Sequence, residues 1–370
     1  MSKVRISGGL FACLLGVYLP IAQTLFLPAP MIKAAGQEAW LALIIAGIVG
    51  TLLAGLPSVW VGMRHPGLGV AQISRRLLGR WAGGAVSLIY IGLLVYIFGL
   101  CIRDIIDFSQ MVLLPGTPGV VIAILFAGIS LYGAWHGLEP TVRVAFQALV
   151  FMVLTAFLVP MLQLREISIK NVDPFLYRGI GSVFQAAFVA LPWFTEIVSI
   201  LGLMQHLKHP QKAHRWLLAG GVASILPISF LTLHMTLALG SDLPARFLYP
   251  TYYLMQLISI AKILERIEVV IVTVFLTGMF IKSALYLFLA AETTAQTFGL
   301  RHHHWPAVGL TALAVVIAHM WGGILNLLYW EAGSISVWVR LSIEVGLPAL
   351  LLTASFIRQA GAGQRGSAHA

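Results

Sequence analysis

The sequence predicts an all-α integral membrane protein of about ten transmembrane helices, built as two five-helix repeats whose first helices are broken. Hydrophobic residues make up 59% of the 370 residues and charged residues only 10%, a composition that water-soluble domains do not have. The apolar runs are about 20 residues long and lack the two-residue alternation of barrel strands, so we expect helical spans. Prolines interrupt two of these runs, five spans apart, which is typical of folds built from inverted repeats.

The ten predicted spans follow one another in order. They cover residues 7–34, 40–62, 82–112, 118–136, 144–163, 179–205, 214–240, 266–291, 305–326 and 335–358. If the N-terminus lies inside, thirteen lysines and arginines fall on the cytoplasmic side and eight on the outer side, as the positive-inside rule requires. We therefore expect a single transmembrane domain over 1–370, with a first repeat at about 7–163, a second at about 179–358, a cytoplasmic tail at 359–370 and both termini cytoplasmic.

The first and sixth spans contain the predicted breaks. Pro20, Pro28 and Pro30 punctuate the first span, and we expect its helix to break near Ile21–Thr24. Ala190–Glu196 interrupts the middle of the sixth span in the same way. In inverted-repeat folds a ligand binds where such helices are broken. The alternative is that the prolines only kink packed helices.

Two connecting segments differ in composition from the predicted spans. Ser241–Leu264 is too interrupted to span a membrane and is rich in aromatic residues, so we expect an outer lid or a re-entrant helix. Arg64–Arg80 is basic and predicts an amphipathic connector on the inner side; a solvated loop that touches anionic lipid is the alternative.

Two charged residues lie inside predicted spans. Lys282 has apolar residues before and after it, and an intramembrane cation there indicates a partner or a cavity; its alternative is to extend along its stem toward the headgroups. Glu196 lies beside the break of the sixth span, where it could carry a proton or accept an amine. Its alternative is to satisfy backbone groups freed by Pro192.

The remaining candidates favour structural roles. Arg103 and Asp107 stand four residues apart near the outer end of the third span, beside Asp104, and predict a local ion pair. His302–His304 is expected in a solvated loop rather than at a metal. Cys13 and Cys101 lie in apolar runs and indicate neither a disulfide framework nor a metal site.

The composition also excludes several classes of function. The net charge of +10 is mostly a topology signal, so we expect a lipid bilayer and no nucleic acid as partner. Nucleophile-elbow, Walker and zinc-helix motifs do not occur in the sequence, so we predict neither an enzyme nor a cofactor.

Four short stretches give the chain a resemblance to a known family. They are LPAPMIKAAGQEAWLA at 27–42, Thr117-Pro118, GLEPTVR at 137–143 and YPTYYLMQLISIAKILERIE at 249–268. In this order and spacing the chain resembles the membrane-embedded B subunit of bacterial spore germinant receptors, up to about Arg358. That resemblance implies membership of the amino acid–polyamine–organocation superfamily and a LeuT-like fold.

The resemblance also implies a function and a set of site residues. Such subunits sense a small nutrient, typically an amino acid, in the spore inner membrane and signal through companion A and C subunits. An autonomous proton-coupled amino-acid transporter is the alternative. The implied ligand-binding positions are Ile21, Ala22, Gln23, Thr24, Ile97, Trp193, Phe194, Glu196, Lys282 and Tyr286. Ile21–Gln23 replaces a glycine-containing break, and Phe194 replaces a small residue, so we expect a narrow pocket.

Two roles for Lys282 stay open. With Tyr286 and with backbone N–H groups freed near Gln23-Thr24, its ammonium could hold a ligand carboxylate, while Glu196 or freed carbonyls hold an amine. Alternatively, Lys282 could substitute for a structural cation at a site where relatives bind sodium.

Overall fold

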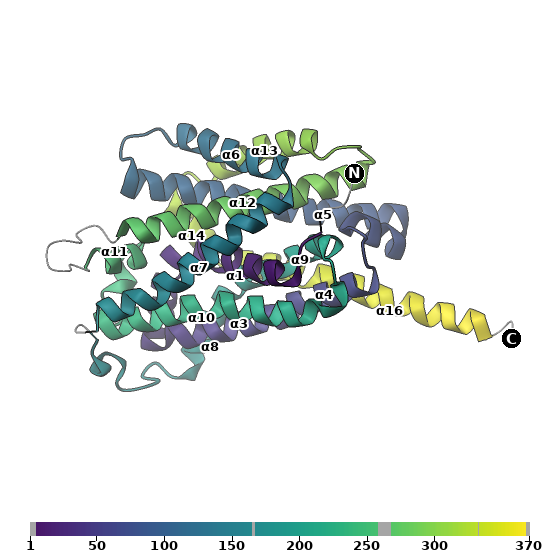
Figure 1. Cartoon of the computed structure of the whole chain (residues 1–370). Coiled ribbons are helices and arrows are strands. Elements are labelled where there is room, and N and C mark those ends of the chain that lie inside the picture. Colours follow the sequence, from purple (N-terminus) through teal and green to yellow (C-terminus); the bar gives the residue numbers. More distant parts are fainter. Residues whose placement is uncertain (1–4, 165–166, 258–267, 332, 368–370) are drawn as a thin grey trace.

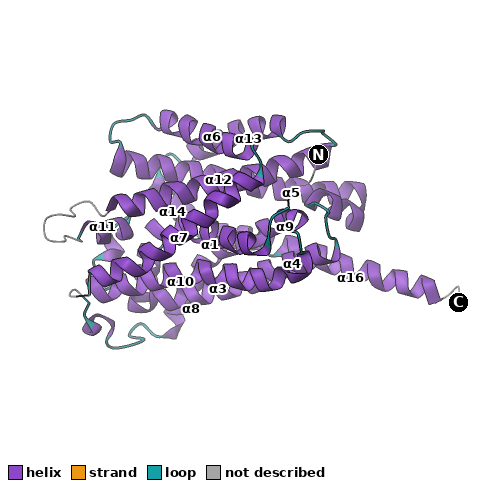
Figure 2. Cartoon of the chain, in the orientation of Figure 1, coloured by secondary structure: helices purple, strands orange, loops and turns teal. Residues whose placement is uncertain are grey.

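Helices form the secondary structure of the residues described by the computed structural model, which are 5–164, 167–257, 268–331 and 333–367 (Figure 2). Within these ranges there is no named β-strand, and only an isolated bridge joins Ile6 to Leu207. A bilayer interior offers backbone groups no water, and helices satisfy those groups within each segment.

The first predicted repeat contains seven α-helices. They are α1 (Gly8–Phe26), α2 (Pro28–Ala35), α3 (Ala39–Gly50), α4 (Leu56–Arg64), α5 (Val70–Phe108), α6 (Gly119–Trp135) and α7 (Leu138–Leu162). A π-turn at Thr51–Gly55 joins α3 to α4, so the two form one continuous span.

The described residues from 180 onward form nine α-helices. They are α8 (Ile180–Thr195), α9 (Ile200–Leu203), α10 (Ala213–Leu239), α11 (Pro250–Gln256), α12 (Glu268–Phe298), α13 (His304–Met320), α14 (Ile324–Glu331), α15 (Ser334–Glu344) and α16 (Gly346–Ser367). Among the described residues, eight helical segments are long and apolar enough to cross a membrane, and α6 and α13 are shorter apolar helices. This order matches the ten predicted spans.

The first span does not break where the sequence predicts. The backbone of Ile21–Thr24 is helical, and α1 continues to Phe26 before a turn at Leu27 leads into α2. Pro28 lacks the N–H that would bond the Thr24 carbonyl, and the Thr251 hydroxyl donates to that oxygen instead at 2.6 Å. The helix therefore does not free N–H groups near Gln23-Thr24, contrary to what the sequence predicts, because an unwound helix in an apolar interior would leave them without partners.

The sixth span changes its helix type inside the predicted segment. The α-helix α8 ends at Thr195, and a 3₁₀ turn covers Glu196–Ser199 before the single turn of α9. A second 3₁₀ turn at Met204–His206 ends the span. Glu196 is therefore the first residue after the regular helix.

The helix α12 runs through the middle of the bundle (Figure 1) and packs on α5, α1, α6, α7 and α13. Gly278 allows its close approach to α1, because a Cβ there would lie 2.1 Å from Cγ1 of Ile21. This contact is one helical turn before Lys282, so α1 packs closely on α12 near the charged residue.

Both ends of the described chain lie at the same end of the bundle, and α11 lies at the opposite end (Figure 1). The basic connector forms the start of α5, where Ile73 and Leu77 are buried while Arg75 and Arg76 are exposed. Gly79, at φ 84°, then turns the chain into the long part of α5. The predicted amphipathic character is confirmed.

The predicted lid is described only in part. Residues 258–264 of Ser241–Leu264 lie outside the described residues, and the rest forms a 3₁₀ turn at Pro244–Arg246 and the short helix α11. Tyr249 is buried and packs edge-on against Phe108 of α5, with ring centroids 5.2 Å apart. At least this aromatic residue belongs to the core rather than to a lipid interface.

Candidate functional site

An ion pair between Lys282 and Glu196 lies at the interruption of the sixth span. The Lys282 ammonium is 2.7 Å from Oε2 of Glu196, and both side chains are 2% exposed. The Tyr286 hydroxyl, one turn further along α12, donates to the same oxygen at 3.3 Å. Lys282 therefore does not extend toward headgroups, because its charge is neutralised inside the bundle.

Arg340 of α15 makes this pair part of a larger network. Its guanidinium donates to Oε1 of Glu196 at 2.8 Å, to Glu331 at 3.1 Å and to Glu344 at 3.2 Å. A fourth bond reaches the Pro192 carbonyl at 2.9 Å. The hydroxyl of Thr195 lies within hydrogen-bond distance of Glu344. Each group is buried, so the network holds opposite charges in contact where an unpaired charge would be very costly.

Side chains from two other helices, α1 and α5, hold the interruption. The Tyr90 hydroxyl donates to the Ser199 carbonyl at 3.1 Å, and Tyr18 shares a 2.7 Å bond with the Ser199 hydroxyl. Nε2 of Gln23 donates to the Trp193 carbonyl at 3.0 Å. A 3₁₀ turn leaves carbonyls without α-helical partners, and the bonds from Tyr90 and Gln23 each satisfy one carbonyl.

A cavity of about 10 Å³ lies beside the ion pair, with room for about one water molecule. Five of the ten sequence-predicted positions line it: Ala22, Ile97, Trp193, Glu196 and Lys282. The other lining residues are Phe26, Leu100, Cys101, Asp104, Leu327 and Glu331. One side of the cavity is apolar and the other carries charges of both signs.

The other five predicted positions lie close by but outside the cavity lining. Tyr286 bonds Glu196, and Gln23 bonds the backbone of the interruption. Ile21 packs against Gly278, and Phe194 packs closely against Gly50 of α3. Thr24 faces away, toward a different cavity.

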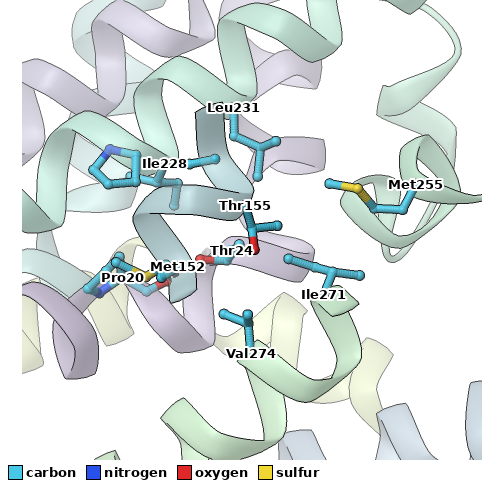
Figure 3. Close-up of a pocket in the computed structure, with 11 residues that line it drawn as sticks. Pro20, Thr24, Met152, Thr155, Ile228, Leu231, Met255, Ile271 and Val274 are labelled. Atoms are coloured by element: carbon cyan, nitrogen blue, oxygen red, sulfur yellow. Dashed lines mark hydrogen bonds between the residues drawn. The ribbon is translucent and has the colours of Figure 1, made fainter. Parts of the chain in front are cut away.

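That second cavity, of about 20 Å³, lies between α1, α7, α10, α11 and α12 (Figure 3). Its lining is almost entirely apolar. The hydroxyls of Thr24 and Thr155 donate to carbonyls of their own helices, at 2.9 Å and 2.8 Å. Neither hydroxyl therefore has its proton free for a ligand, and we place the candidate site at Lys282.

Asp104 joins the site although its position in the sequence indicated an outer rim. It is 7% exposed and lines the cavity with Lys282 and Glu331. Its neighbour Arg103 forms the predicted pair with Asp107, in which Nε is 2.6 Å from Oδ2. Asp107 is also buried, so the ion-pair prediction is confirmed but the pair lies inside the bundle.

Sequence reasoning missed Arg340, Glu331, Glu344 and Asp104. Arg340 stands near the start of the tenth predicted span, and the sequence therefore indicates a charge at the outer end of that span. Its spacing of four residues from Glu344 was a usable signal for an ion pair on one helix face. The contact of Arg340 with Glu196 joins residues far apart in the chain, and spacing alone gives no sign of it.

The histidines at 302–304 pack on neighbouring rings. His304 begins α13 and stacks on Trp135 with ring centroids 4.5 Å apart. Burial, and after it the charge of His304, lowers the pKa of His303. We find no role for these histidines at the site.

Known structures with the same overall arrangement are transporters. Mhp1, a nucleobase-cation-symport-1 family transporter in a closed conformation with bromovinylhydantoin bound, superimposes with a TM-score of 0.70 at 12% identity, covering 95% of this chain and 78% of that one. A Na⁺-coupled sialic acid symporter in a substrate-bound outward-open state gives a TM-score of 0.66 at 11% identity, covering 95% and 79%. The chain thus has the LeuT-like fold of an integral membrane protein.

Sequence comparisons define the family. The model of the spore germination protein family matches residues 10–322. Spore germination protein KB of Bacillus subtilis is 24% identical over 339 residues, 88% of each chain. Spore germination protein YndE of the same organism is 23% identical over 287 residues, 76% of this chain and 78% of the relative. The chain belongs to the spore germination protein family, whose members matched here are named as germination proteins rather than as enzymes.

Proposed function

We propose that this protein is the nutrient-sensing membrane subunit of a spore germination receptor. A small germinant, in the first instance an amino acid, binds at the Lys282–Glu196 cavity and triggers germination through companion A and C subunits. The protein forms one transmembrane domain of two repeats in the spore inner membrane, with both termini cytoplasmic. The observation that carries the proposal is the charged cavity at the interruption of the sixth span.

The size of the cavity implies that binding involves a conformational change. Its 10 Å³ holds about one water, and an amino acid has several times more heavy atoms than that space admits. Binding therefore requires the helices around the cavity to move apart. A ligand that binds only the opened state shifts the population toward that state, and partner subunits can read this shift.

The alternative is an autonomous proton-coupled amino-acid transporter. Two observations favour it: the fold neighbours are symporters, and carboxylates such as Glu331 and Asp104 lie buried at the cavity, where protons could bind. We prefer the receptor because the relatives matched over most of the chain are named as germination proteins.

Purified protein in proteoliposomes separates the two functions. Binding and uptake of a panel of labelled amino acids are measured on the same vesicles, with and without a proton gradient. We expect saturable binding of at least one amino acid and no concentrative uptake. Concentrative uptake without partner subunits would establish the transporter instead, and the lack of binding by every amino acid would remove the sensing proposal.

A further inference from the structure

Asp104 lies in the cavity wall without a partner of its own. Asp104 is 7% exposed and therefore more than nine-tenths buried. In the part of the chain that the structure describes, it accepts no hydrogen bond and forms no ion pair, although Lys282 and Glu331 are within electrostatic range. A carboxylate buried in this way is costly unless a cation or a proton meets it.

The nearby cations are already bound to other carboxylates. Arg103 precedes Asp104 in the chain but holds Asp107 with two nitrogen atoms. Lys282 is 2.7 Å from Glu196. Asp104 therefore gains no counter-ion from its own helix or from the centre of the site.

The charges of the whole site are unbalanced. Two cations, Lys282 and Arg340, face four carboxylates, so the site lacks two positive charges when every group is ionised. The carboxylates are Glu196, Glu331, Glu344 and Asp104. Three of them touch a cation in the structure, and Asp104 in the cavity wall is the one that does not.

We propose that Asp104 binds the ammonium group of the ligand. This inference rests on the proposed function and names the chemistry of what is sensed: a small primary ammonium, such as the α-amino group of an amino acid. The two Asp104 oxygens accept from it, and Trp193, whose ring already has the Arg340 guanidinium 6.0 Å from its centroid, lines the same cavity. Glu196, the sequence-predicted amine acceptor, already receives bonds from Lys282, Arg340 and Tyr286.

A metal ion fits this cavity less well than an ammonium. Hard metal cations take six or more oxygen ligands, whereas Phe26, Leu100 and Leu327 form much of the wall. Among the described residues there is no cluster of three histidine, cysteine or acidic side chains placed to hold a metal. An ammonium ion is about the size of the water molecule that the cavity admits.

The test measures thermal unfolding of the purified full-length chain in detergent. Ammonium chloride and methylammonium chloride are the probes, and potassium chloride at equal ionic strength is the reference. We expect both ammonium salts to raise the wild-type melting temperature more than potassium does. In Asp104→Asn the concentration needed for the same shift should rise roughly 10- to 150-fold, because a charge-assisted contact is lost.

A matched control lies one turn away. Asp107→Asn breaks the pair with Arg103, so it should lower the melting temperature without probe but keep the ammonium response. Asp104→Asn should melt no lower than wild type without probe, because it removes an unpaired charge. The inference is overturned if potassium acts as well as methylammonium, if wild type and Asp104→Asn respond alike, or if Asp104→Asn alone destabilises the protein as Asp107→Asn does.

Amino-acid binding by the same variants separates this inference from the proposed function. Loss of labelled amino-acid binding in Asp104→Asn, but not in Asp107→Asn, supports both. An ammonium response without any amino-acid binding would keep the Asp104 site and remove the sensing proposal. Amino-acid binding that is equal in wild type and Asp104→Asn would keep the sensing proposal and overturn the role of Asp104.

Discussion

Three donors from two helices meet the Glu196 carboxylate inside the bundle. Lys282 and Tyr286 come from α12 and Arg340 from α15, and all of them reach the first residue of the 3₁₀ turn. Because α8, α12 and α15 meet at this carboxylate, a ligand that draws Lys282 toward itself also loosens the contact between these helices. Under the proposed function, Glu196 is therefore the residue at which binding and helix packing are coupled.

Replacing Lys282 tests this coupling in the protein without ligand. In Lys282→Met the carboxylate keeps Arg340 and Tyr286, so the loss of stability should be about 1–3 kcal/mol, below the roughly 3–5 kcal/mol of a fully orphaned buried charge. Glu196→Gln in addition should recover part of this loss, because residue 196 then no longer carries a buried charge that needs Lys282. The melting temperature of the purified protein in detergent measures the stability of both variants.

The exposed Lys208 provides the control, since Lys208→Met removes a charge from the surface. An unchanged melting temperature for Lys282→Met would contradict the structural part of its role. A change in ligand affinity alone would then assign Lys282 to the ligand carboxylate.

At the scale of single residues, the sequence predicted Lys282 and Glu196 as site residues but not their partners. Lys282 and Glu196 stand out because a charge within an apolar run is rare and costly. Their pairing could not be predicted, since a sequence gives depth along a helix but not which helix faces which. For the same reason, Asp104 and Arg340 were assigned to the outer ends of their spans although both are buried.

At the scale of elements, α11 connects the predicted lid to the first span. The Thr251 hydroxyl bonds the Thr24 carbonyl that Pro28 leaves free, and Tyr249 packs on Phe108 one turn beyond Asp104. A ligand that changes the spacing of α1 and α5 therefore acts on α11 directly. The proline that limits α1 thus also provides the attachment point for this helix.

Hydrogen exchange measures this effect on α11. We expect a bound amino acid to slow exchange at 250–256, because a lid moves only if the ligand favours one of its positions. Thr251→Val keeps the shape but loses the hydroxyl, and should speed exchange there by several-fold for a loss of about 1 kcal/mol. Equal exchange in the presence and absence of a saturating amino acid would contradict a role for α11 in sensing.

The attachment of α16 should depend on pH. His65, between α4 and α5, is 3.2 Å from the Ser355 hydroxyl of α16, and burial, followed by the charges of Arg76 and Arg64, lowers the pKa of His65. A lowered pKa means that the folded state favours neutral His65. Its contribution is therefore complete above the ordinary value of about 6.5 and is lost as the pH falls through the lower folded value.

The hydrogen-exchange rate of residues 350–358, corrected for the intrinsic effect of pH, measures this dependence. It should increase between neutral and mildly acidic pH in wild type but not in His65→Gln, which keeps a hydrogen-bonding group without the titration. The same increase in both proteins would assign the effect to another group.

The elements were predicted more fully than the site, for a physical reason. The apolar runs determine ten segments because the bilayer sets their length, and prolines mark the two unusual spans. The break at Ile21–Thr24 was wrong because proline removes only its own donor, while helical bonding elsewhere persists in an apolar interior. In the sixth span, by contrast, side chains from several helices hold the 3₁₀ turn at Glu196.

At the scale of the whole molecule, the bundle encloses a site that is too small for its proposed ligand. The described helices close on a space for about one water, at the point where α1, α5, α8 and α12 meet. Opening is therefore part of binding, and the central claim is that an amino acid enters this cavity and holds the bundle in another state.

The native Cys101 offers the most direct test, because it lines the cavity and is 1% exposed. Replacing Cys13 by serine leaves Cys101 as the only cysteine of the sequence. The rate at which methyl methanethiosulfonate modifies Cys101 is then measured with and without each amino acid that binds. We predict slow modification without ligand and slower modification with a bound amino acid, since the ligand covers the thiol. An amino acid that binds and leaves the Cys101 rate unchanged would contradict the account, because it would bind elsewhere.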